Sequence, residues 1–88
     1  MQRDIDLIVE LLLADIPGVH VAQLKVTHLG DDDGLWFINI PNQDATVQIE
    51  SSNGNCPFLI ESDFNDDRSY GHSIEETVRA VKHLLALA

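Results

Sequence analysis

The sequence has few basic residues. Five lysines and arginines stand against fifteen aspartates and glutamates, which gives a formal net charge of −10. A field of that sign repels phosphate backbones and anionic lipid, so we expect neither nucleic-acid binding nor membrane binding. A basic protein or a cation is attracted instead, although negative charge that merely keeps a small domain soluble is the alternative.

Cysteine is almost absent, since Cys56 is the single example, and no intramolecular disulfide is possible. Secreted domains of this size are often stapled by disulfides. The first ten residues lack the basic stretch and apolar run of a signal peptide, and no apolar run approaches the length of a membrane span. The expected location is the cytoplasm.

Motifs that carry chemistry are also missing. The sequence contains no glycine-rich nucleotide fingerprint, P-loop or G-x-S-x-G elbow, and no histidine pair has the spacing of a helical zinc site. Cys56 precedes a proline in an apolar stretch and is interpreted as a packing residue. A chain of 88 residues also has a thin core with little room for a deep cleft. We therefore expect no enzyme and no cofactor, with an enzyme of unknown type as the weaker alternative.

Two segments have the apolar spacing of helices. Residues 4–16 form one wide apolar stripe that ends at Pro17-Gly18. Ser73 begins the second helix, because Ser73 and Glu76 have the spacing of a capping box ahead of an apolar face.

Between the helices the apolar period is two, which predicts four strands over residues 21–29, 35–40, 45–50 and 56–61. Asn53-Gly54 is a strong hairpin signal. Pro57 cannot donate to a ladder, so the fourth strand lies at an edge or begins after the proline. A polar loop is expected over residues 63–72.

The predicted order is α-β-β-β-β-α, in one α+β domain over residues 1–88. Short connections favour a four-stranded antiparallel meander with the helices packed on it as a two-layer sandwich. Leu35, Phe37 and Leu59 fall on the face opposite Trp36 and Ile38. Either the N-terminal helix wraps that second face, or a partner subunit covers it in a homodimer.

The acidic loops are the distinctive feature of the predicted surface. We expect them to contact a basic protein partner through Asp31, Asp32, Asp33, Asp63, Asp66 and Asp67. A divalent-cation site is the alternative, because Asp63, Asn65 and Asp67 place oxygen ligands at alternate positions, as calcium loops do. Arg68 and Ile74 stand where an EF-hand loop requires glycine and glutamate, so the calcium pattern is incomplete.

The stretch from Asn53 to Leu85 combines a hairpin, a polar acidic loop and a capped apolar helix. In this it resembles small acidic bacterial proteins of uncharacterised function, including immunity proteins that act against polymorphic toxins. The resemblance implies a non-enzymatic cytosolic inhibitor that blocks its toxin by binding. The acidic dimers that serve as type III secretion chaperones are a more distant likeness, because they are longer and have a helix between the strands.

Overall fold

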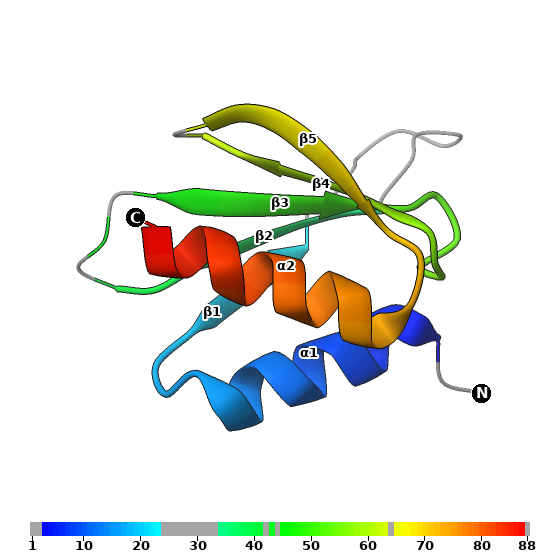
Figure 1. Ribbon diagram of the computed structural model, residues 1–88. Helices are drawn as coiled ribbons and strands as arrows, with labels where there is room; N and C mark the ends of the chain where they lie inside the picture. Colours follow the sequence, from blue (N-terminus) through cyan, green and yellow to red (C-terminus); the bar gives the residue numbers. More distant parts are fainter. Residues whose placement is uncertain (1–2, 24–33, 42, 44, 64, 88) are drawn as a thin grey trace.

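The structure, a computed structural model, describes residues 3–23, 34–41, 43, 45–63 and 65–87 (Figure 1). A helix stands at each end of the described chain, with the strands between them. The elements are α1 (Asp4–Asp15), β1 (His20–Gln23), β2 (Leu35–Asn39), β3 (Thr46–Glu50), β4 (Phe58–Ser62), β5 (Asn65–Gly71) and α2 (Ile74–Leu87).

The strands form one antiparallel sheet in the order β1-β2-β3-β4-β5. The predicted α+β class and the meander of sequential neighbours are therefore confirmed. The prediction of four strands is wrong, because β5 pairs with β4 along the segment that was expected to be a loop. The β2 and β3 strands agree with the predicted bounds to within a residue at each end.

Strand β5 escaped prediction because it is an edge strand with almost no apolar side chains. Tyr70 is its one large hydrophobic residue and is 57% exposed. Backbone pairing with β4 stabilises the strand despite the low strand propensity of its asparagine and aspartates, since propensity in sheets depends on context. Gly71 ends the strand beneath α2, where a Cβ atom would meet Thr77.

Strands β1 and β4 refine two further predictions. Within the described residues β1 comprises His20–Gln23, and residues 24–29 of the predicted strand lie outside them. Strand β4 begins at Phe58, directly after Pro57, which confirms the alternative that the strand starts after the proline. It is not an edge strand, because β5 flanks it.

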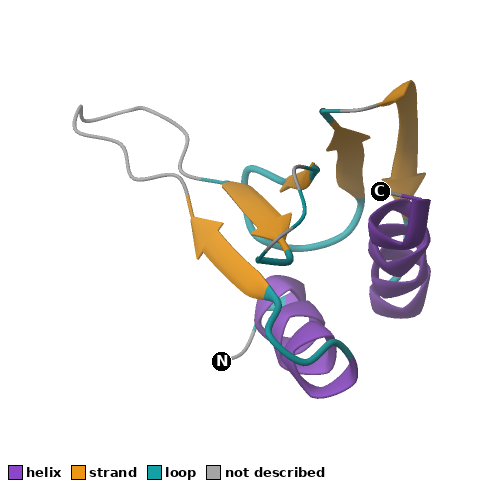
Figure 2. Cartoon of the chain, turned by 90° about the vertical axis from the view of Figure 1, so that its left-hand side faces the viewer, coloured by secondary structure: helices purple, strands orange, loops and turns teal. Residues whose placement is uncertain are grey.

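Both helices pack against the same face of the sheet (Figures 1 and 2). The core joins apolar side chains of the two helices to one face of the strands: Ile5, Ile8, Leu12, Val78, Val81, Leu85, Trp36, Ile38, Val47, Ile49, Phe58 and Ile60. The alternative that the N-terminal helix covers the second face is therefore wrong. Among the described residues, no element covers that face.

The start of α2 follows the predicted cap. The Ser73 hydroxyl accepts a hydrogen bond from the Glu76 backbone N–H at 3.1 Å, which is the first half of a capping box. The Thr77 hydroxyl donates to the Ser73 carbonyl at 2.8 Å. These bonds fix the chain where it leaves β5, so the position of α2 on the sheet is set at Ser73.

Candidate partner-binding surfaces

The face of the sheet away from the helices carries apolar side chains that no described element covers. We call it the open sheet face and define it by Leu35, Phe37, Glu50, Leu59, Glu61 and Tyr70. The register pairs Leu35 with Glu50, Glu50 with Leu59, and Leu59 with Tyr70. Directly paired residues project to the same side of a sheet. One row of four side chains therefore crosses β2, β3, β4 and β5.

The second row of the open sheet face runs parallel to the first. Phe37 pairs with Gln48, and Gln48 pairs with Glu61. Phe37, like Leu35 and Leu59, is half-buried. The open sheet face thus presents half-buried apolar side chains, and no described helix or strand packs against it.

The two carboxylates of this face differ in their surroundings. Glu61 is paired with Arg68, whose Nε lies 3.2 Å from Oε2. Glu50 is exposed, and its carboxylate has no ion-pair or side-chain hydrogen-bond partner among the described residues. A solvated carboxylate between two leucines therefore marks the middle of the first row.

Tyr70 places an aromatic side chain at the β5 end of the first row. Its ring stacks on the ring of His72, with centroids 6.4 Å apart and an interplanar angle of 27°. More than half of Tyr70 remains accessible to solvent. An exposed ring of this kind offers a flat apolar surface and a polar hydroxyl to a partner.

Asp63, one of the predicted contact acids, has a structural role. Its Oδ1 accepts a hydrogen bond from the Thr46 N–H at 2.8 Å, and its own N–H donates to the Thr46 carbonyl at 3.1 Å. This reciprocal pair extends the β3–β4 ladder beyond Ser62. The side chain is exposed at the same time, so Asp63 closes the sheet and also faces solvent.

The side chains of the remaining predicted acids lie outside the described part of the molecule. Asp31, Asp32 and Asp33 fall in the undescribed segment between β1 and β2. Asp66 and Asp67 have their backbone in β5, but their side chains are not described. Of the six predicted contact acids, Asp63 is therefore the one whose side chain the structure describes.

The calcium alternative rests on Asp63, Asn65 and Asp67. Asn65 and Asp67 belong to β5 instead of to the loop that the prediction assumed. Their side chains are outside the described residues, as are any contacts they make. Within the described part of the chain, no three histidine, cysteine or acidic side chains gather as a metal site would require.

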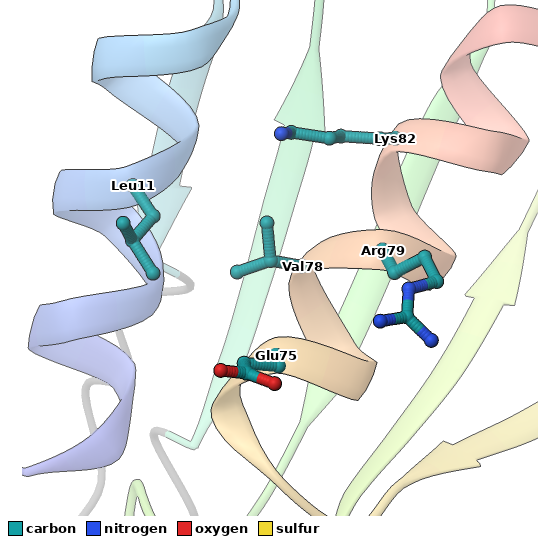
Figure 3. A pocket seen from close by; sticks show the side chains of 5 residues that line it. All are labelled: Leu11, Glu75, Val78, Arg79 and Lys82. Atoms are coloured by element: carbon teal, nitrogen blue, oxygen red, sulfur yellow. The ribbon is translucent and has the colours of Figure 1, made fainter.

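Described side chains of the two helices line two open grooves. One, of about 250 Å³, lies between α1 and α2 (Figure 3). The groove is lined by Leu11 of α1 and by four residues of α2: Glu75, Val78, Arg79 and Lys82. The other, of about 370 Å³, lies at the C-terminal ends of the helices, where Lys82 and Asp15 form an ion pair at 2.5 Å. Each groove is lined by both acidic and basic side chains, so neither groove favours one class of ligand.

Cys56 lies where the N-terminus of α1 meets the loop before β4. Burial raises the pKa of its thiol, and the hydrogen bond and negative charge of Asp4 raise it further. The thiolate is the nucleophilic form of cysteine. At neutral pH the Cys56 side chain is therefore protonated, which agrees with its interpretation as a packing residue.

No family model matches the chain, and neither the curated proteins nor the solved structures give a match. Neither described helix has the length and hydrophobicity needed to cross a bilayer.

Glu50 and Tyr70 were not among the predicted site residues. The alternation of β3 places Glu50 on the solvent side, but only the pairing with β2 and β4 shows that two leucines flank it.

Proposed function

We propose that this chain is a non-enzymatic binding module for a basic protein. The single observation that carries the proposal is the excess of fifteen acidic over five basic residues in a chain of 88. Charge of that density accelerates association with a partner of opposite sign and disfavours partners of the same sign. In its sharpest form the module is an immunity-type inhibitor that occludes a toxin.

Among the described residues, ion pairs neutralise few of the acidic side chains. The described residues contain two ion pairs, Arg68 with Glu61 and Lys82 with Asp15. Glu10, Glu50 and Glu75 are exposed, and their carboxylates have no cationic partner within the described residues. The carboxylates thus remain available to an approaching basic surface.

Capture from the native host tests the proposal. The immobilised chain is incubated with lysate at about 50 mM salt, and bound protein is eluted at about 500 mM, where charge interactions are screened. We expect a basic protein to elute, to form a defined complex with the purified chain, and to lose its own activity in that complex. Capture that does not respond to salt, or capture of acidic proteins, would contradict the proposal.

Charge variants then separate specific from general attraction. Replacement of Asp66 and Asp67 by asparagine should slow association with the captured partner and weaken its salt dependence. Replacement of Glu75 and Glu76 removes the same charge from the helix layer and is the matched control. Equal effects of the two double variants would indicate attraction by net charge without a defined site.

A further inference from the structure

Glu50 combines an exposed carboxylate with apolar neighbours on both adjacent strands. Its carboxylate is exposed, without a cationic partner among the described residues, and it sits in register between Leu35 and Leu59. Neighbouring strands are about 4.8 Å apart, so a long side chain that pairs with this carboxylate is within reach of both leucines. The position therefore suits a ligand that is charged at its tip and apolar along its length.

We propose that the open sheet face is the docking surface for the basic partner, with Glu50 receiving a lysine or arginine side chain. This inference rests on the proposed function. The aliphatic stem of such a side chain lies along Leu35 and Leu59 while its charged head pairs with the carboxylate. A site of this composition selects a cation carried on an apolar segment over a cation alone.

Tyr70 adds a second contact point on the same row. It pairs with Leu59, which pairs with Glu50, so Tyr70 lies two strands from Glu50, or about 10 Å away. One cation cannot contact both groups at that distance. The 57% exposed ring instead receives a further apolar or guanidinium group of the partner.

Charge complementarity favours a basic partner over a second copy of the chain. A second copy brings its own Glu50 and a net charge of −10 to the interface. Arg68 is the arginine of this face, and Glu61 already holds it at 3.2 Å. A basic partner supplies a cation to Glu50, which has no cationic partner among the described residues.

Two synthetic pentapeptides of equal charge test the inference. In one, arginine alternates with leucine, and in the other arginine alternates with serine. Each is titrated into the ¹⁵N-labelled protein. We expect the arginine–leucine peptide to shift the amide signals of Leu35, Glu50 and Leu59 and to bind at least about fivefold more tightly than the arginine–serine peptide.

The variant Glu50→Gln should weaken binding of the arginine–leucine peptide about three- to tenfold. Glu10→Gln, which removes one exposed carboxylate from α1, is the matched control and should change affinity less than about twofold. Circular dichroism of each variant verifies that the fold is retained.

Three outcomes would overturn the inference. The first is equal binding of both peptides, or shifts confined to other surfaces, which leaves the proposed function standing but removes its site. The second is an equal effect of Glu50→Gln and Glu10→Gln. The third is a dimer in sedimentation velocity that Glu50→Gln tightens, because a second copy then occupies the face. The proposed function itself fails separately, in the lysate experiment.

Discussion

The Asp4 carboxylate accepts a hydrogen bond from the backbone N–H of Cys56 at 2.9 Å, across 52 positions of sequence. Two further bonds join the same segments: Asp4 N–H to the Asn55 side-chain oxygen, and Ile5 N–H to the Gly54 carbonyl, both at 2.9 Å. Two free N–H groups of the first turn of α1 are thus satisfied by the β3–β4 connection. This joint holds α1 on the sheet.

Asp4→Ala should lower the free energy of unfolding by about 1–3 kcal/mol, because a part-buried N–H loses a charged acceptor. Urea denaturation measures the change. Glu10→Ala alters an exposed residue of the same helix and should stay within about 0.5 kcal/mol of the parent. If the two variants were equally stable, the joint at Asp4 would have no energetic weight.

The raised pKa of Cys56 makes stability depend on pH in the alkaline range. The folded state holds the thiol proton more tightly than the unfolded state, whose thiol has a pKa of about 8.5. The contribution of Cys56 is therefore fully present below that pH and lost as pH rises through the pKa of the folded thiol. Unfolding curves between about pH 7 and pH 10 should show a steeper loss for the parent than for Cys56→Ala.

Asp4→Asn provides the matching kinetic measurement, because it removes the negative charge that helps to raise the Cys56 pKa. Iodoacetamide reacts with the thiolate, so the variant should react faster than the parent at about pH 8. Identical rates in the folded proteins would mean that burial alone controls this thiol.

The sequence predicted those elements whose apolar period faces the core. Trp36 and Ile38 on β2, and Val47 and Ile49 on β3, are buried as their alternation indicates. Alternation cannot reveal β5, since an edge strand of polar residues is specified by its pairing with β4 and by the small Gly71 under α2. Alternation also cannot show that both helices pack on the same face of the sheet, because the opposite face carries leucines and a phenylalanine as well.

The candidate site illustrates the same limit. Acidic runs such as residues 31–33 are visible in the sequence, and the partner contacts were therefore predicted there. The isolation of Glu50 between Leu35 and Leu59 arises from the register of three strands, which no local pattern encodes. The predicted contact residue Asp63 turned out to bond with Thr46, since its position after β4 makes a hydrogen-bonding partner available across the sheet.

Gly71→Ala should destabilise the fold through a clash with α2. A Cβ atom at Gly71 would lie 1.9 Å from Thr77 Oγ1 and 2.8 Å from Thr77 Cβ, and Thr77 is fully buried. Relief requires α2 to move away from β5, so we expect a loss of about 2–3 kcal/mol. Ser69→Ala, at an exposed position of β5, is the control and should be nearly neutral. If Gly71→Ala were as stable as the parent, the prediction would be wrong, and α2 would lie farther from β5 than the structure shows.

Ser73→Ala should lower the free energy of unfolding by about 1 kcal/mol through loss of the cap on the Glu76 N–H. Ser73→Thr retains the hydroxyl and should cost less than half as much, which separates the cap from other effects of substitution. Thermal unfolding followed by circular dichroism at 222 nm compares the three proteins. An unchanged melting temperature for Ser73→Ala would mean that α2 begins elsewhere.

Asp63→Ala should destabilise the sheet even though its carboxylate is exposed. The Thr46 N–H loses its acceptor at 2.8 Å, and the end of the β3–β4 ladder is left to water, so we expect a loss of about 1 kcal/mol in urea denaturation. Asp63→Asn keeps an oxygen acceptor while removing the charge, and should recover most of that stability. If Asp63 is also a partner contact, both variants should weaken partner binding, whereas a purely structural Asp63 predicts weakening for Asp63→Ala alone. Comparison of the two variants against the captured partner therefore separates the charge of Asp63 from its bond to Thr46.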